Sequence, residues 1–586
     1  MKTIHSFVIL IFSFLLISCA NHSPVKKYNV ILILTDDQGY GDFGFTGNPY
    51  IRTPVLDSLA SVSTRFTQFY VSPVCAPTRS SLMTGRYSLR TGIYDTYNGG
   101  AIMAGSERTM AEVFKANGYV TGIFGKWHLG DNYPCRPVDQ GFDEAIVHGA
   151  GGIGQVGDPL NYYAFDSAYF NPVLEHNGKP EKFTGYCTDI FTQEAIRFIE
   201  ENSSKPFFLY LPFNAPHTPL QVPEEYLKIY EGLVFDTSRF EIQGYPFKLS
   251  GHQNIAAAKR VYAMITQIDR DIGKLFTALR TLDLENHTIV VFLSDNGPQQ
   301  VRYTAGLRGR KGQVYEGGIR VPFLLRTPGL IPQDTDISVP AAHIDLLPTL
   351  VNLCNLKWPE EPDIDGKDLV PLIRGDSPQW SNRSLFYYWQ RGYTEPYRNI
   401  AVRKGNFKLV GNTGWNAGPS DFELFDIMAD PYERFNLATQ QPEKVLELKQ
   451  LFDNWYRKII QSENLVRPPG YIVGSRFQDT VVLNRNDAHG EPGIWAQNEI
   501  FGYWNIHVRE SGVFSFEIHF KDSISRPGKL VMKCGTVQRT LPVSVPAGKT
   551  ILIPGIRLYA GNQRVECWFN VSGKRILPFY IKVWRN

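Results

Sequence analysis

Three short apolar runs, each of which ends abruptly in polar residues, constrain the fold of this chain most strongly. Residues 30–34 contain only valine, isoleucine and leucine, and Asp36 and Asp37 follow them. A run of this length that is apolar on both faces is typical of a strand buried in a parallel sheet. Residues 207–211 and 289–293 have the same form. The sequence therefore predicts a parallel sheet whose strands are covered on both sides.

Polar side chains also follow the second and third runs. Asn214 and His217 come after the second run, and Asp295 and Asn296 come after the third. Between these runs, apolar residues recur every three or four positions across residues 255–279, which predicts an amphipathic helix. Alternating strands and helices indicate an α/β sandwich. Ligands of such sheets bind at the carboxyl ends of the strands, so we expect these polar residues to converge on one site.

The C-terminal third of the chain has a different texture. Short strand-like pieces and a helix near residues 442–460 predict a smaller α+β subdomain, and the alternation of residues 514–520 predicts an all-β module, most simply a sandwich. Packing against the rest of the chain is the simplest role of this module, and independent carbohydrate binding is the alternative. We expect four parts: a signal peptide (1–18), an α/β domain (19–381), the α+β subdomain (382–466) and the β-sandwich-like module (467–586).

The N-terminus has the order of a bacterial lipoprotein signal. Lys2 precedes an apolar run at residues 7–17, and Ser18 stands directly before Cys19. The run is too short to span a bilayer. We expect Cys19 to become the lipidated first residue of a periplasmic or outer-membrane lipoprotein of a Gram-negative bacterium, with this anchor as its sole membrane contact. The alternative is a plain secretory signal in which Cys19 is incidental.

Composition excludes some classes of function. Of the 586 residues, 43% are hydrophobic and 20% are charged, as in globular proteins. The net charge of +3 favours anionic substrates, but the basic residues are scattered, so we expect no nucleic-acid partner. The cysteines after Cys19 form no CxxC pair, which argues against a cysteine zinc site. Export would permit a disulfide, and Cys534 with Cys567 is the first pair to consider.

The segment at residues 72–86 contains the pattern Cys-x-Pro-x-Arg, with Cys75, Pro77 and Arg79. Pro77 suits the first turn of a helix, and Gly85 suits its C-terminal cap. Cys75 would then lie at a helix N-terminus, where backbone N–H groups favour an anion.

This segment closely resembles the signature of the type I sulfatases, which are formylglycine-dependent members of the alkaline phosphatase superfamily. The resemblance extends in family order over roughly residues 28–460. Within the family, the chain resembles bacterial exported carbohydrate and aryl sulfatases. The other motifs that carry it are residues 29–39, 125–130, 215–217, 294–297, Lys311 with 315–318, 343–350, and 423–426 with Asp430. The predicted β module lies outside this range.

The resemblance implies two cofactors. Hard oxygen ligands suit Ca²⁺, with Mg²⁺ as the alternative. The implied metal ligands are Asp36, Asp37, Asp295, Asn296 and the modified residue 75. The second cofactor is formylglycine (3-oxoalanine), which a maturation enzyme makes from Cys75. His343 stands at an ordinary helix start, and we expect it to be structural.

The resemblance also implies how the sulfate ester is attacked. The hydrated aldehyde at position 75 attacks sulfur while Asp295 helps to remove its proton, and a sulfated enzyme forms. Arg79 and Lys126 would steady the diol and its oxyanion.

A second set of residues would complete the reaction. His217 and Lys311 would hold the sulfate oxygens, and either of them could protonate the leaving alcohol. His128 would then take the proton from the second hydroxyl, which expels sulfate and restores the aldehyde.

The expected substrate is an O-sulfated glycan, of the galactose or N-acetylgalactosamine type or a glycosaminoglycan saccharide. Residues 94–104 and 148–158 are candidate sugar-contact loops, with ordinary surface connections as the alternative. Two other functions compete. The first, a phosphomonoester or phosphonate hydrolase of the same superfamily, is disfavoured by Cys-x-Pro-x-Arg. The second, a non-catalytic lipoprotein that binds sulfated glycans, is disfavoured because no expected catalytic position is missing.

Overall fold

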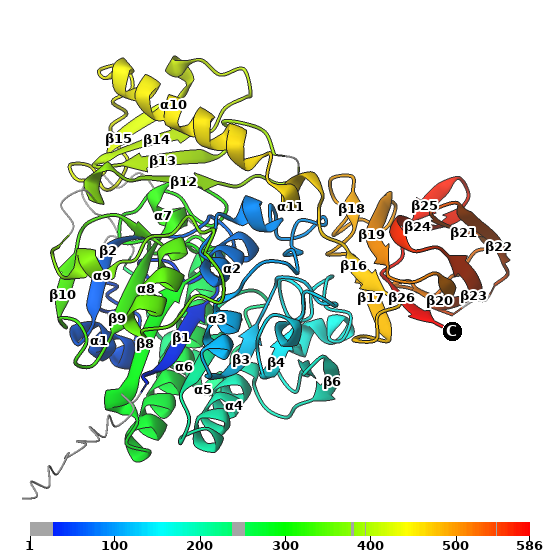
Figure 1. Cartoon of the computed structure of the whole chain (residues 1–586), viewed down its shortest axis with the longest axis horizontal. Helices are drawn as coiled ribbons and strands as arrows, with labels where there is room; N and C mark the ends of the chain where they lie inside the picture. The colour runs from blue at the N-terminus through cyan, green and yellow to red at the C-terminus, as the bar shows by residue number, and fades with distance from the viewer. Residues whose placement is uncertain (1–26, 237–251, 377–379, 393, 546–547) are drawn as a thin grey trace, which may run out of the picture.

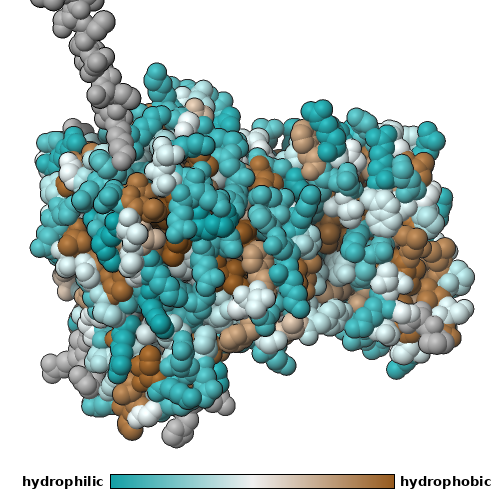
Figure 2. Space-filling view, turned by 90° about the horizontal axis from the view of Figure 1, so that it is seen from below, coloured by the Kyte–Doolittle hydropathy of each residue, from teal (hydrophilic) through white to brown (hydrophobic). Residues whose placement is uncertain are grey.

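The computed structural model describes residues 27–236, 252–376, 380–392, 394–545 and 548–586. The predicted signal peptide and the anchor position Cys19 lie outside these ranges. Among the described helices, none is long and apolar enough to cross a membrane. The molecule has a broad body and a narrower lobe at one end (Figure 2).

The centre of the broad body is a mixed sheet. Eleven strands of the described residues form it, in the order β10-β2-β9-β8-β1-β7-β3-β4-β5-β6, with β11 beside β2 (Figure 1). The strands are β1 (Asn29–Thr35), β2 (Thr64–Tyr70), β3 (Val120–Lys126), β4 (Glu144–His148), β5 (Val173–His176), β6 (Lys179–Lys182), β7 (Phe207–Pro212), β8 (Thr288–Ser294), β9 (Arg320–Arg326), β10 (Thr335–Ile337) and β11 (Ala341–Ala342). β1 lies between β7 and β8 and is parallel to both. The three predicted buried strands are therefore neighbours at the centre of the sheet.

Helices cover both faces of this sheet. Ile31 and Ile33 of β1 face α1, α4, α5 and α6, whereas Val30, Leu32 and Leu34 face α2, α3 and α8. The helices are α1 (Pro54–Ser61), α2 (Cys75–Thr84), α3 (Met110–Ala116), α4 (Cys187–Glu201), α5 (Glu224–Glu231), α6 (His252–Thr281), α7 (Glu316–Ile319), α8 (Leu346–Leu353) and α9 (Val370–Ile373). The continuous apolar run of β1 is thus explained, since both of its faces are buried. The predicted α/β sandwich and its long amphipathic helix, α6, are confirmed.

A smaller antiparallel sheet follows in the chain. Its strands and helices are β12 (Ser384–Tyr388), β13 (Ile400–Lys404), β14 (Phe407–Gly411), β15 (Glu423–Asp426), α10 (Pro442–Ile459) and α11 (Glu463–Val466). Leu448 and Phe452 of α10 pack on one face of this sheet against Val402 and Leu409. The opposite face packs against the large sheet, as expected for an α+β subdomain.

In the narrower lobe, the regular elements formed by the described residues are all strands. They form a seven-stranded and a four-stranded sheet: β16 (Tyr471–Val473), β17 (Thr480–Asn484), β18 (His489–Gly490), β19 (Gly502–Val508), β20 (Gly512–His519), β21 (Gly528–Cys534), β22 (Val537–Val543), β23 (Thr550–Leu558), β24 (Gly561–Val571), β25 (Lys574–Ile576) and β26 (Tyr580–Arg585). Side chains of both sheets share one apolar core, so this β module (residues 471–585) is a sandwich, as predicted. Cys534 and Cys567 are buried free thiols.

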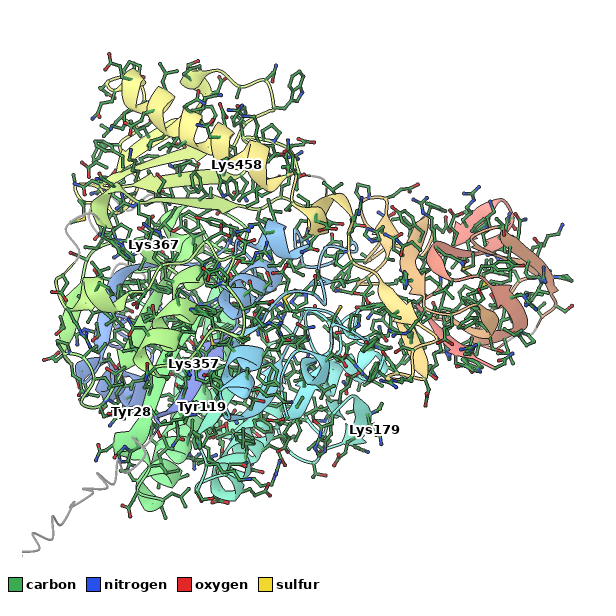
Figure 3. All side chains as sticks on the ribbon, viewed as in Figure 1. Tyr28, Tyr119, Lys179, Lys357, Lys367 and Lys458 are labelled. Carbon is green, nitrogen blue, oxygen red and sulfur yellow. The ribbon has the colours of Figure 1, made fainter. Side chains whose placement is uncertain are left out.

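The amino and carboxyl ends of the strands in the large sheet differ in role. Tyr28 and Tyr119, which directly precede β1 and β3, mark the amino ends of these strands (Figure 3). The carboxyl ends lie at the opposite edge, toward the α+β subdomain and the β module. The labelled lysines Lys179, Lys357 and Lys367 are spread over the broad body instead of forming one patch (Figure 3).

Candidate active site

Four polar residues meet at the carboxyl ends of two adjacent strands. Asp36 and Asp37 follow β1, Asp295 and Asn296 follow β8, and all four are fully buried. The register of the parallel pair brings the ends of β1 and β8 together. The backbone N–H of Asp37 donates to Oδ1 of Asp295 at 3.1 Å. The predicted convergence of these residues is thus present in the structure.

The predicted helix after residue 74 is α2, which begins at Cys75. It ends at Gly85, whose φ of 68° gives the left-handed cap that favours glycine. Cys75 is buried at the N-terminus of this helix. Burial raises the pKa of the Cys75 thiol, and the charges of Lys126 and Lys311 offset only part of this effect. Since thiolates and not thiols are nucleophiles, the unmodified side chain is poorly suited to attack an ester.

Three of the strand-end residues each leave one buried oxygen unpaired. Oδ2 of Asp36 accepts from Lys126, and Oδ1 of Asp37 accepts from Lys311 at 2.7 Å and from Asn296 Nδ2 at 2.8 Å. The other oxygens, Oδ1 of Asp36, Oδ2 of Asp37 and Oδ1 of Asn296, have no hydrogen-bond partner among the described residues. Buried polar atoms are normally paired, and these are hard oxygens. The arrangement fits a Ca²⁺ or Mg²⁺ ion.

Asp295 differs, because protein groups already satisfy both of its oxygens. Its Oδ2 accepts from Nη2 and Nε of Arg79 at 2.9 and 3.2 Å. Burial and the charge of Asp36 raise the pKa of Asp295. For Asp36, burial favours the neutral form, but the charges of the surrounding cationic groups, Lys126 first among them, outweigh it and hold the pKa well below its usual range. Metal-ligand atoms of Asp36, Cys75 and Asp295 still lie within 4.8 Å of one another, so one ion could contact all three.

A further buried arginine supports this cluster, and sequence reasoning missed it. Asp37 has a φ of 64°, an uncommon backbone conformation for aspartate. Arg302 donates to the Asp37 carbonyl oxygen at 2.6 Å and to Oδ2 of Asp42 at 2.7 Å. These charged hydrogen bonds hold the Asp37 backbone in place. Arg302 belongs to no recognised motif, and no sequence signal connects it with Asp42.

Each of the two predicted histidines has one ring nitrogen close to a backbone carbonyl oxygen. Nε2 of His128 lies 2.9 Å from the carbonyl oxygen of Thr96, and its buried Nδ1 has no partner among the described residues. Nδ1 of His217 lies 2.7 Å from the carbonyl oxygen of Thr218. Burial and the charge of Lys311 lower the pKa of His217 to about 4, so its imidazole is neutral. The pKa of Lys311 lies above its usual range, because Asp37 and the other anionic groups around it together outweigh burial.

A pocket of about 220 Å³ lies against these groups, and Cys75, His128, His217 and Lys311 are in its wall. Both candidate sugar-contact loops also reach it: Thr96 and Tyr97 come from residues 94–104, and Gly151 and Gln155 come from residues 148–158. Arg79 and Lys126 are fully buried behind the carboxylates and do not line the pocket.

Five more pocket residues were not predicted: Thr218 and Gln299, which lie close to predicted motifs, and three from distant parts of the chain. Arg391 comes from the loop after β12, and Asn486 and Trp495 come from the β module. None of them belongs to a recognised motif, and no periodicity marks them. His343, which we expected to be structural, lies 3.2 Å from Ser72 Oγ through its Nε2 and does not line the pocket.

Comparison with known families identifies the family of the chain. The family profile described as Sulfatase matches residues 28–356, and the one described as N-sulphoglucosamine sulphohydrolase, C-terminal, matches residues 310–459. The chain belongs to the sulfatase family. It is therefore a sulfuric ester hydrolase of the alkaline-phosphatase-like superfamily, and the resemblance seen in the sequence is confirmed.

Individual relatives agree with this assignment. An ulvan-active sulfatase from Formosa agariphila is 32% identical over 466 residues, which are 73% of this chain and 82% of the relative. Arylsulfatase A from Homo sapiens is 31% identical over 507 residues, 75% of this sulfatase and 90% of that one. The crystal structure of Ps i-CgsB in complex with k-i-k-neocarrahexaose has a TM-score of 0.63 and 30% identity, and it covers 75% of this chain and 94% of its own.

Proposed function

We propose that this sulfatase removes O-sulfate from a sulfated glycan, with a formylglycine made from Cys75 and a bound Ca²⁺ or Mg²⁺. One observation carries the proposal. Cys75, at the N-terminus of α2, belongs to the same site as three buried oxygens of Asp36, Asp37 and Asn296 that have no hydrogen-bond partner among the described residues. One pocket gives access to Cys75 and to the cationic Lys311. A sulfate ester carries the negative charge that such a site would bind.

The residues that would hold the cation are Asp36, Asp37, Asn296 and Asp295, with the side chain of residue 75 facing them. When bound, the cation would offset negative charge on the sulfate and on the attacking oxygen. Lys126 and Arg79 reach the same carboxylates from the buried side. Although burial opposes it, their positive charges hold the pKa of Asp36 well below its usual range, so this ligand is ionised and ready for a cation.

Formylglycine would remove the difficulty that the thiol presents. Burial raises the pKa of Cys75 and keeps the thiol protonated. An aldehyde at this position supplies, once hydrated, one hydroxyl for attack on sulfur and a second that allows sulfate to leave. Cys75 is 2% exposed in the folded chain, so we expect the maturation enzyme to act before folding is complete.

The proton transfers divide between two sides of the pocket. Lys311 keeps its proton and lies in the pocket wall, so it is the better donor to the leaving oxygen of the sugar. His217 is neutral, and its Nδ1–H is directed to the Thr218 carbonyl, so it would contact the sulfate through Nε2. His128, whose Nδ1 is unpaired, would accept the proton that has to leave before sulfate is expelled.

Two observations favour a glycan as substrate. One relative is an ulvan-active sulfatase, and one similar structure contains k-i-k-neocarrahexaose. Both predicted sugar-contact loops line the pocket. The N-terminal sequence supports export, and we propose an outer-membrane or periplasmic lipoprotein anchored through Cys19.

Two measurements test the proposal. Mass spectrometry of the peptide that contains residue 75 should show loss of sulfur and gain of an aldehyde, and Cys75→Ala should abolish turnover. A panel of O-sulfated galactose, N-acetylgalactosamine, glucosamine and uronic acid saccharides should identify a substrate. Active protein with an intact thiol and a preference for phosphate monoesters would overturn the proposal. If the enzyme hydrolysed an aryl sulfate but desulfated no saccharide of the panel, only the glycan assignment would be overturned.

A further inference from the structure

The β module forms part of the wall of the active-site pocket. Asn486 and Trp495 line the same pocket as Cys75 and Lys311. The module lies outside both family matches, which end at residues 356 and 459. A part of the chain that the family profiles do not include therefore completes the site where the ester is bound.

The contact between the module and the loop at residues 94–104 is specific. The backbone N–H of Gly99 donates to the Asn486 carbonyl at 3.3 Å, and Asn486 Nδ2 donates to the Thr96 carbonyl at 3.3 Å. The backbone N–H of Gly490 donates to Oδ1 of Asn98 at 3.0 Å. Gly99 has a φ of 71°, and a Cβ there would lie 2.2 Å from the His489 ring, so only glycine fits. These contacts fix the module relative to the pocket.

Two aromatic rings and one arginine come together in the wall of this pocket. The rings of Tyr97 and Trp495 have centroids 6.1 Å apart and an interplanar angle of 32°. The guanidinium carbon of Arg391 lies 4.2 Å from the centroid of the Tyr97 ring. Both rings are half-buried, and the Arg391 side chain is 44% exposed. Tyr97, Arg391 and Trp495, which we call the mouth cluster, thus offer apolar ring surface beside hydrogen-bond donors.

A buried carboxylate holds the arginine in position. Nη1 of Arg391 donates to Oδ1 of Asp95 at 2.8 Å and to Oγ1 of Thr96 at 3.0 Å. Asp95 is fully buried, and it also accepts from the backbone N–H of Gly392 at 3.1 Å. Nε and Nη2 of Arg391 make no hydrogen bond to the described residues. An arginine fixed at one end, with free donors at the other, is well placed to bind oxygen atoms of a ligand.

We propose that the mouth cluster is a saccharide-binding subsite and that the β module is thereby part of the active site. A sugar ring of the substrate packs its C–H face on Trp495 and Tyr97, while Arg391 donates to its oxygen atoms. The inference rests on the proposed glycan sulfatase function. It adds that selection of a saccharide over a small aryl ester depends on a residue of the β module.

The test compares two substrates of the same enzyme. One is the saccharide that the wild-type enzyme desulfates fastest in the panel above, and the other is 4-nitrophenyl sulfate. We expect Trp495→Ala and Arg391→Met each to lower the ratio of kcat/KM for saccharide over aryl sulfate by about tenfold, mainly through the saccharide KM. Trp584→Ala, which changes a half-buried tryptophan of the module outside the pocket, should leave both values as in the wild type.

The outcomes separate the subsite from a structural role. The subsite would be overturned if kcat/KM fell equally for both substrates, or if the ratio of the two kcat/KM values were unchanged in both variants. If Trp495→Ala lowers the melting temperature, the kcat/KM ratio measured for Arg391→Met decides between a subsite and a structural role, because Arg391 lies outside the module. A wild-type enzyme that desulfates no saccharide would instead overturn the proposed function, before any variant is made.

Discussion

Thr96 fixes the tautomer of His128, because its carbonyl oxygen lies 2.9 Å from Nε2 of the imidazole. A carbonyl oxygen can only accept a hydrogen bond, so Nε2 carries the proton and Nδ1 keeps a lone pair. Burial and the charge of Lys126 lower the pKa of His128 well below 6.5. His128 is thus a neutral base with one defined nitrogen free to accept a proton.

The first prediction is that His128 does not titrate near neutral pH. Because its pKa is lowered, the imidazole stays neutral as the pH falls through 6.5, and it gains a proton only under more acidic conditions. NMR of the protein labelled with ¹⁵N-histidine should show an Nε2–H tautomer throughout this range, assigned by the loss of its signal in His128→Gln. A midpoint at 6.5, or an Nδ1–H tautomer, would contradict this account.

The second prediction concerns the step that His128 serves. His128→Gln removes the base but not the attack on sulfur, so the first turnover should proceed and the second should be slow. We expect kcat to fall about 10²–10⁴-fold, the usual contribution of a general base. A burst of one alcohol per enzyme, with sulfate covalently attached at residue 75 by mass spectrometry, would support this role. Slow turnover without a burst would mean that His128 acts in or before the attack on sulfur.

The strand ends were predictable because each depends on a local pattern. The run at residues 30–34 is apolar on both faces, so its burial in a parallel sheet and the placement of Asp36 at the carboxyl edge both follow. α2 could be placed in the same way from Pro77 and Gly85. The convergence of the metal-site candidates then followed from the topology of parallel sheets.

The rest of the pocket was not predictable from one sequence. Arg391 and Trp495 reach it from loops with no periodicity, and their positions depend on how the α+β subdomain and the β module pack on the sheet. Arg302 stabilises Asp37 through a contact between residues far apart in the chain. The resemblance to sulfatases could not supply Trp495, because the module lies outside the matched range.

The third prediction distinguishes Lys311 as the acid for the leaving group. A sugar alkoxide is a poor leaving group and needs a proton, whereas 4-nitrophenolate does not. Lys311→Met should therefore lower kcat/KM about 10²–10³-fold for a saccharide sulfate but only about tenfold for 4-nitrophenyl sulfate, where only the loss of a positive charge is felt. His217→Gln should affect both substrates alike. A greater loss for the saccharide in His217→Gln would reverse the two assignments.

The fourth prediction concerns removal of the cation. Without it, buried oxygens of Asp36, Asp37 and Asn296 are left unpaired, so chelation should abolish activity and lower thermal stability. A ligand present at a thousandfold excess over its Kd contributes about 4 kcal/mol to stability. Ca²⁺ or Mg²⁺ should restore both properties, because the ligands are hard oxygens. Unchanged melting in EGTA, with no metal detected per chain, would contradict the site.

The last prediction concerns the contact between the large sheet and the α+β subdomain. Lys408 of β14 is fully buried and lies 2.9 Å from carboxylate oxygens of both Glu316 and Glu433. Lys408→Met removes the cation that the two buried carboxylates share and leaves Glu316 with only Arg320 at 3.6 Å, which should cost about 3–5 kcal/mol in urea unfolding followed by tryptophan fluorescence. Lys404→Met, which removes a partly exposed lysine of β13 that pairs with Glu447 of α10, should change stability by less than about 1 kcal/mol. Adding Glu433→Gln to Lys408→Met should recover part of the loss, because the carboxylate that lost its ion-pair partner is removed. Equal effects of the two lysine variants would show that the buried cluster does not stabilise this contact.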